Sequence, residues 1–360
     1  MSDLKNNLDE LQSKAKERTV KTQTIEYDLE TIVKKINRNI IKLNPDYQRK
    51  HRWSDEASSK LIESLILNIP IPFIYISQDV DVDEEIEDDI SRFSVIDGQQ
   101  RLTAIFKFFN NQYSLSDLEV LSPLNGCFYN DLPPFLIRRL EERSIRCLRI
   151  DSTVDQQVKY DIFERLNSGS VKLEPQELRN ATCRGPFKEL IKKLAKEKFF
   201  VLNANLSEGS KRVIKMEDEE LVLRYFAITY RDGYLDYKGG FKKFLTSKMI
   251  TFNKLSAETL NDFENEFNGV MKLLNDVMKN LPFAKYNFDK NELSKMSNFN
   301  VSVFDAIISL GRKSYLENKK LDRNLILKLF EDRDFFNACE GSTNDVSKLT
   351  TRIRKSLELI

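Results

Sequence analysis

The segment FSVIDGQQRLTAIFKFF, residues 93–109, constrains the fold of this chain more than any other. Its first residues have the pattern of a buried strand, and after a break at Asp97 and Gly98 apolar residues recur at helical spacing. Mixed α/β domains are built from strands that pass into helices in this way. We therefore expect an α/β region around this segment.

The rest of the chain divides into two regions with different patterns. Up to about residue 182, expected strands at 21–27, 73–76, 92–96 and 144–151 alternate with expected helices at 28–39, 55–68, 99–110, 132–143, 153–167 and 173–181. From residue 183 onward strand patterns fade, and helical patterns follow at 186–198, 216–230, 239–250, 256–279, 298–316 and 321–333. Gly311 is expected to stop the apolar run that begins at 298. The predicted fold class is α+β, with a helical arm at 1–20, a mixed α/β domain at 21–182 and a mainly helical domain at 183–360.

Composition excludes several classes of protein. With 41% hydrophobic and 31% charged residues the chain is typical of globular proteins, and no apolar run approaches the roughly 20 residues that cross a bilayer. The polar N-terminal sequence lacks the apolar centre of a secretory signal, so we expect a cytoplasmic protein without a membrane partner. The four cysteines are far apart, which favours reduced, buried thiols.

Three kinds of enzyme centre are also excluded. The single histidine, His51, cannot supply an HNH-type nuclease centre or an H-E-x-x-H metal site, and the sequence has no G-x-x-x-x-G-K-[ST] loop.

The net charge is +1, but eight acidic residues crowd DVDVDEEIEDD at 79–89, so the remainder of the chain is basic. A solvated or disordered hairpin loop is the expected state of this acidic segment, and a partner-binding or nucleic-acid-mimicking flap is the alternative. The basic remainder permits a polyanionic partner.

The junction residues Asp97, Gly98, Gln99, Gln100 and Arg101 allow two interpretations. A helix start has unpaired backbone N–H groups and a partial positive charge, so it attracts anions. Gly98 lets the backbone turn sharply, the glutamine amides donate hydrogen bonds, and the Arg101 guanidinium matches a phosphate. Asp97 repels a phosphate but suits a Mg²⁺ ion that bridges phosphates. In the other interpretation Asp97 caps the helix and Arg101 forms a salt bridge.

Two further polar clusters accompany this turn. In YDIFERLNSGSVKLEPQELRNA, residues 160–181, an expected helix end carries Arg165 and Asn167, and the next helix start carries Gln176, Glu177, Arg179 and Asn180. The other cluster combines aromatic rings with guanidinium groups, which suits stacking on a nucleic-acid base: Tyr47, Gln48, Arg49, Arg52 and Trp53. Both clusters also fit purely structural roles, as a capped corner or a cation–π pair. In KMEDEELVLRYFAITY the acidic residues suit a helix start, and we expect a salt bridge for Arg224, with a contact to a ligand as the alternative.

A resemblance to the N-terminal domain family of GmrSD-type restriction endonucleases is carried by five segments in order: NPDYQRKHRWS, IPIPFIYI, VIDGQQRLTAI, DIFERLNSGSVKLEPQELRNA and EDEELVLRYFA. It covers about residues 25–330 and implies a ParB/sulfiredoxin-like fold and a role in defence against foreign or modified DNA. It also implies a nucleotide-binding pocket at Asp97 to Arg101, with Arg49, Arg165 and Asn167 as neighbours. An NTP and Mg²⁺ are the implied cofactors, with Asp97 as the catalytic or metal-binding residue.

Family members that cut DNA pair this domain with a histidine-rich HNH nuclease domain, which this chain cannot supply. We therefore expect an NTP-binding, and potentially NTP-hydrolysing, recognition or regulatory component. Its expected partners are double-stranded DNA, a separate HNH-type or other nuclease, and a second copy of itself. A DNA- or protein-binding module without catalysis is the alternative. A self-sufficient Mg²⁺-dependent nuclease using Asp97 and Glu177 is less favoured, because the carboxylates show no recognisable two-metal spacing.

Overall fold

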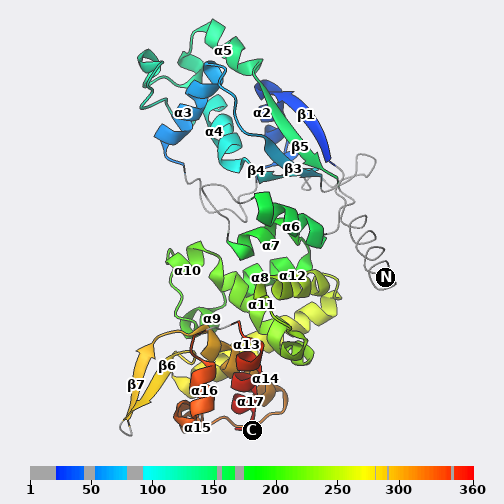
Figure 1. Ribbon diagram of the computed structural model, residues 1–360, viewed down its shortest axis with the longest axis vertical. Helices are drawn as coiled ribbons and strands as arrows, with labels where there is room; N and C mark the ends of the chain where they lie inside the picture. The colour runs from blue at the N-terminus through cyan, green and yellow to red at the C-terminus, as the bar shows by residue number, and fades with distance from the viewer. Residues whose placement is uncertain are drawn as a thin grey trace, which may run out of the picture. The chain divides into compact units, whose positions relative to one another are not determined.

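The computed structural model describes residues 22–43, 53–78, 92–151, 156–166, 174–279, 281–289, 292–341 and 344–360 (Figure 1). The chain divides into two compact units, Met1–Leu173 and Glu174–Ile360. The expected arm at 1–20 and the acidic segment at 79–89 lie outside the described residues. The domain boundary at residues 182–183 stays a prediction, because compactness alone does not define an independently folding domain.

The first unit is a mixed α/β region, as expected. Its elements in chain order are β1 (Thr22–Asp28), α2 (Leu29–Asn37), β2 (Ile41–Lys42), α3 (Asp55–Ile66), β3 (Ile74–Gln78), β4 (Phe93–Asp97), α4 (Gln99–Phe109), η1 (Ser122–Leu124), η2 (Tyr129–Asp131), α5 (Pro134–Glu141), β5 (Ser144–Ile150) and α6 (Gln156–Leu166). Among the described residues, five strands form one sheet in the order β1-β5-β3-β4-β2. The sheet is mixed, because β1 with β5 and β3 with β4 are antiparallel, whereas β3 with β5 and β2 with β4 are parallel.

Capping and alternation explain why these elements form. Asp28 caps α2 by accepting a hydrogen bond from the Thr31 backbone N–H at 2.6 Å, and Ser54 caps α3 from Ala57 at 3.3 Å. Alternate residues of the strands, such as Ile74 and Ile76, are fully buried on one face of the sheet. That face shares a hydrophobic core with α2, α3, α4 and α5. Helices α2 to α5 therefore form a layer on this face of the sheet.

The second unit is mostly helical, which also confirms the expectation. Its elements are α7 (Pro175–Thr182), α8 (Pro186–Leu194), α9 (Lys198–Asn203), α10 (Lys211–Ile214), α11 (Glu217–Thr229), η3 (Tyr230–Asp236), α12 (Phe241–Phe252), α13 (Ala257–Met278), β6 (Lys285–Asp289), β7 (Glu292–Ser297), α14 (Val301–Leu316), α15 (Arg323–Lys328), η4 (Leu329–Glu331), α16 (Arg333–Ala338) and α17 (Val346–Leu357). Aromatic rings dominate its core; the Phe226 and Phe263 rings, for example, stack with centroids 4.5 Å apart.

One element of this unit was not predicted, and one expectation was wrong. Strands do occur after residue 183, because β6 and β7 form an antiparallel hairpin. Gly311 does not stop a helix: it lies inside α14, where an added Cβ would come within 2.9–3.1 Å of the Leu274 side chain on α13. A glycine at that position lets the two helices approach closely, and this packing outweighs its low helix propensity.

A buried ionic triad joins α11, α14 and α17. The Asp305 carboxylate accepts hydrogen bonds from Arg224 Nε at 2.5 Å, Arg224 Nη2 at 2.7 Å and Arg352 Nη2 at 2.5 Å. Asp305 and Arg352 are completely buried, and the Arg224 guanidinium lies 3.8 Å from the centre of the Phe241 ring. The salt bridge expected for Arg224 is thereby confirmed, and its partner comes from 81 residues away along the chain.

The described cysteines all carry free thiols. Cys147, Cys183 and Cys339 are buried, and Cys127 is half-buried. Burial raises the pKa of Cys147 to about 12 and that of Cys339 to about 12, so both remain protonated at neutral pH. In the part of the chain that the structure describes, no helix combines the length and apolar character needed to cross a membrane.

Candidate functional site

The D-G-Q-Q-R turn joins the end of β4 to the start of α4. β4 lies between β3 and β2 in the sheet, and Asp97, its last residue, is opposite Tyr75 of β3. Gly98 follows with φ +94° and ψ 10°, and Gln99 begins the helix. The strand, the turn and the helix thus lie where the sequence pattern predicts them.

Gly98 is required here for two independent reasons. Its φ of +94° belongs to the left-handed region, which residues with a Cβ adopt only at a cost. An added Cβ would also lie 2.3 Å from Ile74 Cδ1 and 3.2 Å from Arg101 Nη2. The backbone of the turn therefore packs directly against the beginning of β3.

Arg101 fixes this arrangement by bonding to the chain that enters β3. Its Nη1 donates to the Pro72 carbonyl, and its Nη2 donates to the Phe73 carbonyl at 3.2 Å and to Asp97 Oδ2 at 2.9 Å. The Arg101 side chain is only 12% exposed, and burial lowers its pKa while the neighbouring Asp97 partly offsets this effect. We call this set of bonds the Arg101 clamp. The sequence alone did not suggest it, because its carbonyl acceptors lie 28 and 29 residues earlier in the chain.

The structural interpretation of the turn is half right. Arg101 and Asp97 form the expected salt bridge, but the N-cap residue of α4 is Gly98, and no side chain caps the helix. Asp97 does not point at the first-turn N–H groups as a cap would, since its carboxylate turns to Arg101 instead. The Asp97 side chain is 47% exposed, so it remains open to solvent beside the helix start.

The other residues predicted for the site are distributed differently. Gln99 is buried and Gln100 half-buried in the first turn of α4. Arg165 is exposed near the end of α6, and Trp53 packs at the edge of the core of the first unit. The remaining predicted residues lie outside the described residues: Tyr47, Gln48, Arg49, Arg52 and Asn167.

The polar residues of α7 belong to a buried network instead of an open corner. Arg179 is 1% exposed and donates to Gln176 Oε1 at 2.8 Å and to Glu220 Oε2 at 2.8 Å. Asn180 donates to Glu219 Oε2 at 2.6 Å. Two of the sequence motifs, EPQELRNA and EDEELVLRYFA, are therefore joined by hydrogen bonds between α7 and the first turn of α11. Glu177 is buried and accepts a hydrogen bond from the Glu174 backbone N–H at 2.7 Å.

The groups around the turn define what it can bind. Within the described residues, no group of three or more histidine, cysteine, aspartate or glutamate side chains is placed to hold a metal ion. At the turn, one half-exposed carboxylate stands beside a helix start whose orientation the Arg101 clamp fixes. A helix start of this kind is suited to an anion, and the carboxylate beside it to a cation that accompanies the anion.

Comparison with known proteins gives one match. No curated protein and no solved structure matches the chain. The family model of the GmrSD restriction endonuclease N-terminal domain matches residues 29–183. This range contains the D-G-Q-Q-R turn, the strands β2 to β5 and the helix α7. Residues 29–183 of this chain therefore belong to the family of GmrSD restriction endonuclease N-terminal domains.

Proposed function

We propose that this chain is a nucleotide-binding component of a restriction system and that the phosphates of an NTP bind at the start of α4. The observation that carries this proposal is the geometry of the turn. Gly98 fills the N-cap position without a capping side chain, and the Arg101 clamp fixes the helix start against β3. The family to which residues 29–183 belong supports the restriction role.

Each residue of the turn has a chemical task in this proposal. The first-turn backbone N–H groups and the helix dipole attract the phosphates. Gln100 adds amide donors from the half-buried first turn. Arg101 is a positioning residue: it orients Asp97 and contributes positive charge from behind the turn. Arg49, Arg165 and Asn167 are proposed as further phosphate contacts.

Asp97 fits a Mg²⁺ ion that arrives with the nucleotide. One of its oxygens, Oδ2, accepts from Arg101, which leaves the half-exposed carboxylate able to offer Oδ1 to a cation. When bound, Mg²⁺ would neutralise phosphate charge and prepare the NTP for hydrolysis. Asp97 is in this scheme the residue that holds the metal.

The fold and the partners complete the proposal. A ParB/sulfiredoxin-like arrangement is supported by the mixed sheet with helices α2 to α5 packed on one face. Double-stranded DNA is the proposed polyanion, with Tyr47, Gln48, Arg52 and Trp53 as contacts. A separate HNH-type or other nuclease is the proposed effector, because this chain has one histidine. Nucleotide binding or hydrolysis would then control that effector.

A second candidate function is favoured by one observation. The Arg101 guanidinium is already neutralised by Asp97 and bonded to two carbonyls, so it has little freedom to grip a phosphate. If the D-G-Q-Q-R turn has only a structural role, the chain is a DNA- or protein-binding module that does not respond to nucleotide. The two functions differ in whether nucleotide changes the protein at all.

The experiment compares thermal unfolding of the full chain with each of the four NTPs, with and without Mg²⁺. We expect at least one NTP to raise the Tm, because a ligand that binds only the folded state stabilises it. Gln100→Glu should remove this shift, because a carboxylate in the first turn repels phosphates but is tolerated by the helix. The matched control is Gln112→Glu, an exposed residue just beyond α4, which should leave the shift intact.

Two outcomes contradict the proposal. If no NTP changes the Tm in either condition, the turn does not serve nucleotide and the binding module is favoured. If Gln100→Glu and Gln112→Glu respond alike to an NTP that does bind, the nucleotide site lies elsewhere.

A further inference from the structure

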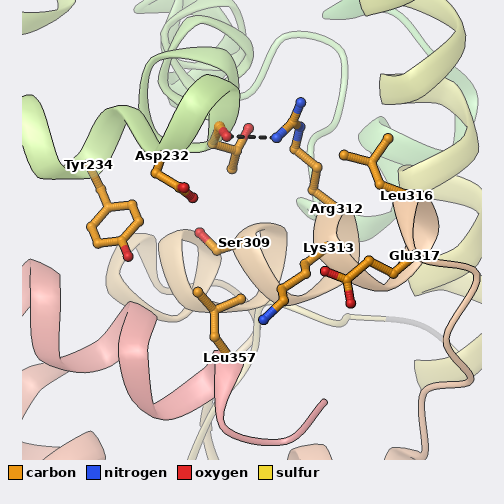
Figure 2. Close-up of a pocket in the computed structure, with 9 residues that line it drawn as sticks. Asp232, Tyr234, Ser309, Arg312, Lys313, Leu316, Glu317 and Leu357 are labelled. Atoms are coloured by element: carbon orange, nitrogen blue, oxygen red, sulfur yellow. Dashed lines mark hydrogen bonds between the residues drawn. The ribbon is translucent and has the colours of Figure 1, made fainter.

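The second unit contains a pocket that lies between η3, α14 and α17. Its volume is about 370 Å³, within the range of small-molecule sites. Figure 2 shows the side chains around it. The lining residues are Thr229, Asp232, Tyr234, Ser309, Arg312, Lys313, Leu316, Glu317 and Leu357.

One wall of the pocket is rigidly built. Arg312 donates from Nε and Nη2 to the two oxygens of Glu266 at 2.6 and 2.9 Å. Its Nη1 donates to the Thr229 carbonyl at 2.8 Å, the bond that is dashed in Figure 2. The Tyr225 hydroxyl donates to the same carboxylate at 3.1 Å. These bonds hold the end of α11 against α14. The wall is therefore organised before any ligand arrives, which lowers the entropic cost of binding.

The part of the pocket formed by η3 is held in an unfavourable backbone conformation. Arg231 and Asp232 have φ values of +50° and +54°, in the left-handed region, and neither is a glycine or an asparagine. Gly233 follows, and a Cβ there would lie 2.2 Å from the Ala227 carbonyl oxygen. Backbone strain of this kind gathers at binding and active sites, where it presents a particular side chain. Here it presents Asp232 to the pocket.

Four charged side chains line the cavity, and they interact in pairs over longer distances, Asp232 with Arg312 and Lys313 with Glu317. Neither Asp232 nor Lys313 has an ion-pair partner within 4 Å among the described residues. The hydroxyls of Tyr234 and Ser309 also line the pocket, and Leu316 and Leu357 add apolar surface (Figure 2). A cavity with a cation and an anion that form no close ion pair, together with two hydroxyls, matches a ligand with complementary groups at two ends.

We infer that this pocket binds a small metabolite with an anionic group, held by Lys313, and a hydrogen-bond donor group, held by Asp232. An α-amino acid has this chemistry through its carboxylate and ammonium groups, and a ribonucleoside monophosphate through its phosphate and ribose hydroxyls. The pocket lies entirely within the second unit, so the inference does not depend on the function proposed for the D-G-Q-Q-R turn.

The test is thermal unfolding of the full chain with two ligand panels, the common α-amino acids and the four ribonucleoside monophosphates. We expect a member of one panel to raise the Tm, and the panel that responds identifies the source of the ligand. Lys313→Ala and Asp232→Asn should each weaken the response at least tenfold in ligand concentration. Gln112→Glu, an exposed change in the other unit, should leave it unchanged.

A second pair of variants separates a binding role from a structural one. Asp232→Gly removes the left-handed strain, so it should raise the Tm of the free protein while abolishing the ligand response. Asn205→Gly is the control, because Asn205 has a similar φ of +51° in an exposed position and does not line the pocket. It should keep the full response. The inference is overturned if neither panel changes the Tm, or if the response survives Lys313→Ala and Asp232→Gly.

Discussion

Replacing Asp305 by alanine should destabilise the second unit more than any change of a single surface charge. The substitution leaves Arg224 and Arg352 as two buried guanidinium groups that have lost their common carboxylate. Removing one partner of a buried ion pair costs about 3–5 kcal/mol. For a unit of this size each kcal/mol lowers the Tm by roughly 2–4 °C, so we expect a decrease of about 6–20 °C.

The assay uses two signals that report different parts of the chain. Far-UV circular dichroism follows all helices, whereas the single tryptophan, Trp53, lies in the first unit. Asp305→Ala should lower the transition seen by circular dichroism. A decrease of the same size in the Trp53 fluorescence transition would show that the two units unfold together.

Two further variants keep this prediction open to refutation even if Asp305→Ala fails to fold. Glu358→Ala removes an exposed ion pair with Arg354, 3.8 Å apart at the end of α17, and should cost no more than about 1 kcal/mol. The triple variant Asp305→Leu, Arg224→Met, Arg352→Met replaces the whole triad by apolar groups and should recover most of the lost stability. A loss below about 1 kcal/mol for Asp305→Ala, or no recovery in the triple variant, would refute the reasoning.

Two other predictions concern the turn and the α7–α11 network. Gly98→Ala should destabilise the first unit by about 2 kcal/mol or more, because it adds a steric overlap with Ile74 to the cost of a positive φ. Gly126→Ala, with a similar φ of +89° and open space around it, should cost only the conformational part; equal losses in Trp53-monitored urea unfolding would argue against the overlap. Burial raises the pKa of Glu219 above its ordinary value of 4.5, so the folded state binds this proton more tightly than the unfolded state. The protonated Glu219 side chain therefore contributes stability that is lost as the pH rises from about 4.5 through the pKa of Glu219 in the folded state. Glu219→Gln should flatten that part of the curve of unfolding free energy against pH. Urea midpoints at several pH values check this, with exposed Glu26→Gln as control, and an unchanged slope would contradict it.

Local elements were largely predictable from the sequence because their signals are local. The strand ending at Asp97, the glycine after it and the helix from Gln99 all follow from residue type and periodicity. Ser54, a residue type common at helix starts, caps α3. The hairpin of β6 and β7 was missed because KYNFDKNELSKMS is mostly polar and alternates too weakly to indicate a strand.

Long-range partners could not be predicted in the same way. Nothing near Arg101 indicates that its guanidinium bonds to the Pro72 and Phe73 carbonyls, since that pairing depends on β3 and β4 being neighbours in the sheet. A salt bridge was expected for Arg224, but its partner, Asp305, can be predicted only from how α11 and α14 pack against each other. Gly311 shows the reverse error: a local stop signal was overridden by close packing on Leu274.

The hydrogen bonds of α7 determine how far this domain can be separated from its surroundings. Residues 174–183 are part of the family match, yet they lie in the second compact unit, where Arg179 and Asn180 bond to Glu220 and Glu219 of α11. A chain cut after residue 183 would leave the Arg179 guanidinium without its carboxylate and the apolar side of α7 exposed. The smallest transferable piece is therefore larger than the matched segment. A shortened chain that keeps α7 therefore also needs α11, whose acidic first turn accepts the hydrogen bonds of Arg179 and Asn180.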